Sequence, residues 1–172
     1  SIKIAPGTRF KLDQGKSIIF RNTILALGSK NLPIIFESSN YNKNKIWGTI
    51  ALQGIKSKGS ILKNVIFDGG SGAIVDQIYY TSMLSLHDTK NVKLSNIILR
   101  NNHIYDDSLH LVYCDNIELD NIVINNAFGD ALDIDISKNI IISNSKFINP
   151  VNDGIDLMES EVLIDASIIT GA

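Results

Sequence analysis

The sequence has a single cysteine, Cys114, among 172 residues. One cysteine excludes an internal disulfide framework, and it fits neither a cysteine-based zinc site nor a CxxC redox motif. No apolar run approaches the roughly 20 residues that a membrane-spanning helix needs, and no basic segment followed by an apolar one opens the chain. The sequence therefore predicts no membrane span, and it leaves Cys114 as a structural thiol.

An excess of charge of one sign is also missing. The 16 basic and 18 acidic residues are mixed along the chain and give a net charge of -2. Without a basic stripe to neutralise phosphates, nucleic acid is not an expected partner. Helical periodicity is absent as well, because apolar residues nowhere keep helical spacing over three turns. With 44% hydrophobic residues, the chain is expected to bury a real core as one domain.

What the sequence does contain is a repeat. The segments "SMLSLHDTKNVKLSNIILRNN", "DSLHLVYCDNIELDNIVINN" and "DALDIDISKNIIISNSKFIN" share one template, and "DGIDLMESEVLIDASIIT" continues it. Asn96, Asn121 and Asn144 recur after 25 and then 23 residues, and Asp130 and Asp153 are also 23 residues apart. Periods of this size are typical of solenoids, in which each unit buries its apolar face against its neighbours.

Within each unit the apolar residues alternate, as at Leu109 and Leu111 and again at Ile117 and Leu119. Alternation over short runs predicts strands, and the Asn, Asp, Ser and Gly residues between the runs predict corners. Each repeat is thus expected to hold three short strands. Stacking the repeats predicts four interior rows: Leu84, Leu109, Leu132 and Ile155; Leu86, Leu111, Ile134 and Leu157; Val65, Ile97 and Ile122; and Phe67, Leu99, Ile124 and Phe147.

One corner of every repeat carries asparagine. The predicted stack contains Asn64, Asn96, Asn121 and Asn144. Stacked amide side chains can hydrogen-bond along the solenoid and satisfy turn amides that water does not reach. We therefore interpret this asparagine ladder as part of the fold.

These features predict an all-β fold, a right-handed parallel β-helix with about 23–25 residues per coil, and the sequence resembles the pectin lyase-like superfamily. The opening stretch "IAPGTRFKLDQGKSIIFRNTILALGSKNLPIIFESS" resembles the first coils of uncharacterised β-helix repeat regions in secreted bacterial proteins. We expect one domain over residues 1–172, with opening coils at 1–46, regular coils at 47–172 and a loop excursion at 68–81. The sequence begins and ends in the middle of the repeat pattern, so we expect it to be a fragment of a longer chain. The resemblance implies an extracellular or cell-envelope location.

Alternation places acidic side chains on the outward face of the first strand in successive coils. Asp133 and Asp156 are expected one rung apart, at roughly 5 Å, with Asp135 beside Asp133 and His110 one rung below. Three interpretations stay open: solvated surface; a hard-cation site, such as one for calcium, formed by Asp133, Asp135 and Asp156; and a catalytic set of Asp133, Asp156 and His110. No other cofactor is expected.

The corner residues Asp130 and Asp153 precede this strand, where aspartate commonly caps its turn, and we interpret both as structural. Two longer loops, "DGGSGAIVDQIYYTS" and "NNHIYDD", are expected to flank the acidic face. With Asp135, their aromatic and histidine residues could bind substrate: Tyr79, Tyr80, His103 and Tyr105. The alternative is that the tyrosines anchor the loops.

The leading functional prediction is a domain that presents a groove for polysaccharide. The first alternative is a polysaccharide hydrolase, lyase or epimerase. The chain lacks the Asn-Thr-Asp and Gly-His-Gly motifs of polygalacturonases, the Asp-Pro-His of alginate epimerases and the basic catalytic residue of pectate lyases. The second alternative is a structural or adhesin-type spacer. Exposed strand edges at the ends predict end-to-end self-association or stacking on further coils of the parent chain.

Overall fold

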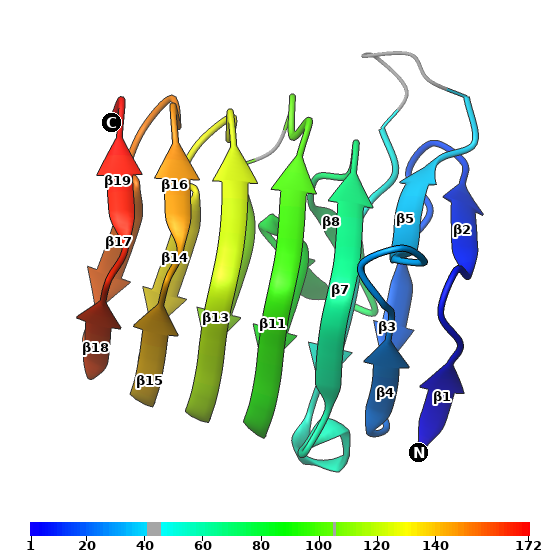
Figure 1. Ribbon diagram of the computed structural model, residues 1–172, viewed down its shortest axis with the longest axis horizontal. Coiled ribbons are helices and arrows are strands. Elements are labelled where there is room, and N and C mark those ends of the chain that lie inside the picture. The colour runs from blue at the N-terminus through cyan, green and yellow to red at the C-terminus, as the bar shows by residue number, and fades with distance from the viewer. Residues whose placement is uncertain (41–45, 105) are drawn as a thin grey trace.

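The computed structural model describes residues 1–40, 46–104 and 106–172, and nearly all of its regular structure is β-strand. The strands lie side by side in chain order, so that the colour in Figure 1 runs steadily from one end of the molecule to the other. The helical element in the described ranges is the short 3-10 turn η1, Ile55–Ser57. Within these ranges, no helix is long and apolar enough to cross a membrane.

Two parallel sheets make up the body of the molecule. The larger, with 11 strands, contains β1 (Ile2–Ile4), β2 (Arg9–Leu12), β4 (Ile24–Leu27), β5 (Ile34–Ser38), β7 (Ile61–Asp68), β11 (Lys90–Arg100), β13 (Asp115–Asn125), β15 (Lys138–Ser143), β16 (Lys146–Ile148), β18 (Val162–Asp165) and β19 (Ile168–Thr170). The smaller has six: β3 (Ile18–Phe20), β6 (Ile50–Gln53), β10 (Ser82–His87), β12 (Asp107–Val112), β14 (Leu132–Asp135) and β17 (Ile155–Met158). The chain passes from one sheet to the other in every coil, which confirms the parallel β-helix.

The three short strands predicted for each coil are only partly separate. β11 and β13 each run for 11 residues across two of the predicted strands. Each bends at an asparagine with left-handed backbone, Asn96 with φ 54° and Asn121 with φ 52°. Asparagine tolerates this conformation better than most residues, so the corner forms without breaking the strand. In the last coils the same path is divided into β15 and β16, and into β18 and β19.

The asparagine ladder is present along these bends. Asn64 donates to the Gly28 carbonyl at 2.9 Å, Asn96 donates to Asn64 at 3.2 Å, and Asn121 donates to Asn96 at 2.7 Å. Asn144 keeps the corner conformation but donates instead to the Asp120 carboxylate at 2.7 Å. A second amide contact, which the sequence did not predict, joins Asn116 to Asn91 at 2.8 Å.

The interior rows have the predicted register. Leu84 pairs with Leu109, Leu109 with Leu132, and Leu132 with Ile155. The other predicted rows align in the same way, and the core that they form is buried through most of the molecule. In the last coil the interior positions are more open, since Leu157 is 45% exposed.

The excursion at 68–81 folds as a small antiparallel hairpin of β8 (Ala73–Val75) and β9 (Ile78–Tyr80). Its base is fixed by Trp47, which is fully buried and donates its indole N–H to the Asp68 carbonyl at 2.8 Å. Gly70 lies against this ring, and a Cβ there would approach it to 2.4 Å. The close approach explains the glycine, and Trp47 closes this corner.

The opening coils continue directly into the regular ones. β4 and β5 both pair with β7, and β3 pairs with β6. The residues from 1 onward therefore belong to the same two sheets as the repeats. The predicted boundary near residue 46 adjoins positions 41–45, which lie outside the described residues.

Candidate functional site

The outward residues of the six-stranded sheet form the row that the repeat predicted. Ser85 of β10 pairs with His110 of β12, His110 pairs with Asp133 of β14, and Asp133 pairs with Asp156 of β17. Asp135 lies two residues along the same strand from Asp133, and therefore on the same face. The sequence-predicted catalytic residues are thus neighbours on consecutive rungs.

Burial changes steeply along this row. Ser85 is fully buried and His110 is 6% exposed, whereas the Asp133 side chain is 18% exposed and Asp156 lies in the open. The cover over the buried part is the β8–β9 hairpin. Its last residues reach the sheet, where the Tyr80 ring packs on His87 with ring centroids 4.7 Å apart. The outward face is consequently half covered and half accessible.

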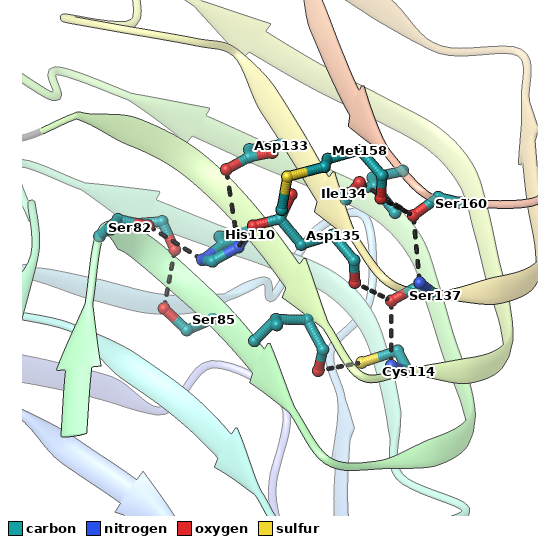
Figure 2. A network of polar contacts seen from close by, with 12 residues as sticks. Ser82, Ser85, His110, Cys114, Asp133, Ile134, Asp135, Ser137, Met158 and Ser160 are labelled. Carbon is teal, nitrogen blue, oxygen red and sulfur yellow. Dashed lines mark hydrogen bonds and ion pairs between the residues drawn. The ribbon is translucent and has the colours of Figure 1, made fainter.

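His110 is held at both ring nitrogens (Figure 2). Its Nε2 lies 3.3 Å from Asp135 Oδ2 and 3.6 Å from Asp133 Oδ2, and its Nδ1 lies 2.9 Å from the Thr81 Oγ1. Burial lowers the pKa of His110, although the nearby Asp135 carboxylate partly opposes this effect. The ring is therefore neutral near neutral pH, and its environment is set by two carboxylates and one hydroxyl.

Two aspartates in this region bind their protons unusually tightly. Burial, followed by repulsion from Asp135 and Asp156, raises the pKa of Asp133 to about 7. Burial also raises the pKa of Asp107, which is 2% exposed, to about 8. Asp133 Oδ1 is buried and has no hydrogen-bond partner among the described residues. Near neutral pH, Asp133 can thus either give or take a proton, as a general acid or base requires.

His87 lies deeper under the hairpin. It is 6% exposed and packs between the Tyr80 ring and the edge of His110, whose ring centroid is 5.4 Å away. Its Nε2 is buried without a hydrogen-bond partner in the described part of the chain. Burial and the neighbouring His110 lower the pKa of His87 to about 4. His87 therefore joins the hairpin to the covered end of the site.

The residues predicted to bind a sugar differ in how deeply they are buried. Tyr80 is fully buried and donates its hydroxyl to Gln53 Oε1 at 2.9 Å, which is the anchoring role left open for the loop tyrosines. Tyr79 follows the opposite face of β9 and is 52% exposed. His103 is half-buried in the loop before β12, and Tyr105 lies outside the described residues. Of the three that the structure describes, Tyr79 has the most exposed side chain.

The predicted cation ligands are divided between two groups. Asp133 joins Asp107 and His110, whereas Asp156 joins Asp130 and Asp153, with the potential ligand atoms of each group within 4.8 Å of one another. Asp135 turns instead toward His110. These oxygen-rich groups could hold a hard cation. Clusters of this kind are common without an ion, and the His110–Asp135 contact satisfies part of the first group without one.

The corner aspartates differ from each other. Asp130 is 6% exposed, and its Oδ1 accepts the backbone N–H of Asp153 and the Asn152 amide, both at 2.7 Å. This confirms Asp130 as a turn cap. Asp153 is exposed, and its carboxylate receives a longer contact of 3.4 Å from Asn152. The structural role predicted for both residues therefore applies mainly to Asp130.

Three residues near the site were not predicted to take part in it. Asp107 occupies the same place in its repeat as Asp130, so the template could have identified it. His87 lies on the predicted outward face, but only the position of the hairpin reveals that it is buried. Thr81 carries no signal in the sequence, because it lies in the excursion and outside the repeat.

In comparisons with protein-family models, with curated proteins and with solved structures, the chain matches none.

Proposed function

We propose that this chain is a β-helix domain that binds polysaccharide on the outer face of the six-stranded sheet and acts on it by acid–base chemistry. The observation that carries the proposal is the position of Asp133. It is accessible on one side, lies beside His110 on the other, and has a pKa raised to about 7. Perturbed groups of this kind cluster at functional sites.

The roles follow from the burial gradient. Asp133 is suited to donate a proton to a leaving oxygen, because burial favours its neutral form. Asp156 is exposed one rung away, as a second carboxylate on the same face. Glycoside hydrolases pair two carboxylates in this way. A hydrolase is therefore the reaction class that we favour over a lyase, which would need a basic residue in the row.

The charge of the face also restricts the polymer. Asp133, Asp135 and Asp156 would repel a polyanion, so a neutral or amino-sugar polymer fits the bare site, while a uronic-acid polymer would need a bridging cation such as calcium. The resemblance to pectin lyase-like repeats of secreted bacterial proteins supports polysaccharide as the partner. It also supports an extracellular or envelope location for the domain.

The decisive experiment is a combined binding and turnover screen with neutral, amino-sugar and uronic-acid polymers, the last with and without calcium. We expect Asp133→Asn to lower turnover by at least about 100-fold while binding is retained. Asp165→Asn is the matched control, because Asp165 is an exposed aspartate on β18 of the other sheet. It should change neither quantity.

The same screen separates the alternatives. Wild-type binding without turnover would contradict the catalytic role and leave a polysaccharide-binding module. Neither binding nor turnover would contradict the whole proposal and favour a structural or adhesin-type spacer with a solvated acidic face. End-to-end association, tested by light scattering at rising concentration, would support the spacer further.

A further inference from the structure

The last turn of the hairpin brings a hydroxyl group to the site. Thr81 joins β9 to β10, and its Oγ1 lies 2.9 Å from His110 Nδ1. The preceding residue, Tyr80, is fixed by its ring contact with His87 and its hydrogen bond to Gln53. The Thr81 backbone carbonyl also accepts the Asp107 N–H at 3.2 Å. The hydroxyl is therefore held in place by an anchored segment.

The position of the His110 proton follows from its partners. A neutral imidazole carries one N–H, and a carboxylate can only accept a hydrogen bond. The Nε2 faces the Asp135 and Asp133 carboxyl groups, so an ionised Asp135 requires the proton on Nε2. Nδ1 is then an acceptor, and the Thr81 hydroxyl can satisfy it by donating.

Asp107 can compete with His110 for the proton of the Thr81 hydroxyl. Burial raises the pKa of Asp107 to about 8, and an interaction of its carboxylate with the Thr81 hydroxyl partly opposes this rise. Thr81 has only one O–H proton, so it can serve an ionised Asp107 or His110 Nδ1, but not both. A protonated Asp107 no longer needs the Thr81 proton, which is then available to Nδ1. Burial of Asp107, which favours its protonated form, is consistent with this arrangement.

We propose that Thr81 is a positioning residue that holds His110 in the Nε2–H tautomer, with this N–H directed at Asp135 and Asp133. The inference rests on the proposed function only for its effect on turnover. Without the hydroxyl, Nδ1 would be buried without a partner, which favours a change of tautomer or a rotation of the ring. Asp133 would then lose the fixed donor beside it.

The first test reads the tautomer directly and needs no substrate. Nitrogen-15 NMR of the labelled protein distinguishes the two ring nitrogens, and the three histidines can be assigned with single His→Gln variants. We expect the wild type and Thr81→Ser to show His110 as the Nε2–H tautomer at pH 7. Thr81→Val, which keeps the shape and removes the hydroxyl, should show a mixture or the other tautomer.

Because pH could also change the tautomer, the spectra should be followed from pH 6 to 9. The titratable groups near the ring are His87 from β10, Asp107 from its own strand β12 with the preceding Asp106, and Asp133 and Asp135 from β14. An Nδ1–H tautomer in the wild type at pH 7 would overturn the inference. The same tautomer in the wild type and in Thr81→Val would also overturn it.

The second test uses turnover, if the screen finds a substrate. We expect Thr81→Val to lower kcat roughly 10- to 100-fold and Thr81→Ser to restore most of it. Unchanged turnover in Thr81→Val would contradict the positioning role while the proposed function stands. A tautomer change in Thr81→Val without any wild-type turnover would support the positioning role and contradict the proposed function.

Discussion

One outer face of this β-helix has two unlike halves. The outward residues of β10 are buried along the whole strand, whereas β17, three positions along in the same sheet, is mostly exposed. The backbone register is the same in both halves. Two causes contribute to the difference. The hairpin inserted at 68–81 packs on β10 through Tyr80 and His87, and β17 is the edge strand of its sheet, where even the interior residue Leu157 is 45% exposed.

The boundary between the halves falls inside the candidate site. His110 lies at the covered side and Asp156 at the open side, with Asp133 between them. A carboxyl group at such a boundary is partly desolvated and still reachable, which is the combination that raises a pKa without removing access.

The largest effect is expected from removing the anchor of the cover. Tyr80→Ala should lower the free energy of unfolding by about 3 kcal/mol, because it deletes a fully buried ring. Urea unfolding followed by circular dichroism would measure it. Ile74→Ala, in the same hairpin but at a side chain that is 68% exposed, should cost under about 0.5 kcal/mol. Equal costs for the two variants would show that the hairpin is not anchored through Tyr80.

The covered half should also make the fold sensitive to acid. The pKa of His87 is lowered from 6.5 to about 4 in the folded chain, so between these values the unfolded chain binds a proton that the folded chain does not. The contribution of His87 is therefore complete above pH 6.5 and is lost as the pH falls toward 4. The loss should be on the order of 3 kcal/mol.

The measurement is urea unfolding at a series of pH values. His87→Phe keeps a ring between Tyr80 and His110 but cannot be protonated, so its stability should fall less over this range. A pH dependence identical to that of the wild type would mean that His87 takes up a proton without disturbing the cover.

A smaller effect is expected at the corner before the site strand. Asp130→Ala should cost about 1 to 2 kcal/mol, because the Asp153 N–H and the Asn152 amide lose their acceptor. Asp153→Ala should cost under about 0.5 kcal/mol, since its side chain is exposed. Thermal unfolding of both variants would compare them. The reverse order would contradict the assignment of Asp130 as the turn cap.

The smallest effect concerns Asp133 and has the opposite pH sign from His87. The folded pKa of Asp133, about 7, lies above its ordinary value of 3.8, so its contribution to stability is largest at low pH and is lost as the pH rises toward 7. Because Asp133 is partly exposed, solvent screening reduces the effect, and Asp133→Asn should stabilise the fold by about 1 kcal/mol at pH 8 and by less at pH 4. Asp156→Asn, on the open side, is the control. A destabilised Asp133→Asn at pH 8 would instead indicate a bound cation or a required charge.

Much of the fold could be predicted because each coil of a solenoid requires the same kind of residue at the same position. Leu84 and Leu109 occupy the same interior row, and a charge in either would meet an apolar neighbour above and below. The asparagine corner could also be predicted, since left-handed backbone restricts the residue type. The sequence could not predict that two strands merge in β11, because a bent continuous strand and two short strands show the same alternation of apolar and polar residues.

The candidate site was predicted only where it belongs to the repeat. The positions of His110, Asp133 and Asp156 follow from strand register, so their juxtaposition could be derived. The burial of Tyr80 and the contact of Thr81 with His110 depend on how one inserted hairpin folds back. A single insertion has no internal repeat to compare with, so the sequence did not predict which side chains it would place on the sheet.

The bend at Asn96 and Asn121 also bears on how such a molecule can change in length. The pairing of β11 with β13 skips Asn96 and Asn121 and resumes in the same register at Ile97 and Ile122, while the two amide side chains hydrogen-bond at the bend. Each coil therefore keeps its register with the next. Deleting or duplicating a whole coil would shorten or lengthen the molecule by about 4.8 Å and return every side chain to its own face. Deleting one residue within a strand would exchange inside and outside as far as the next corner. Gain and loss in whole coils is therefore the kind of length variation that this architecture tolerates.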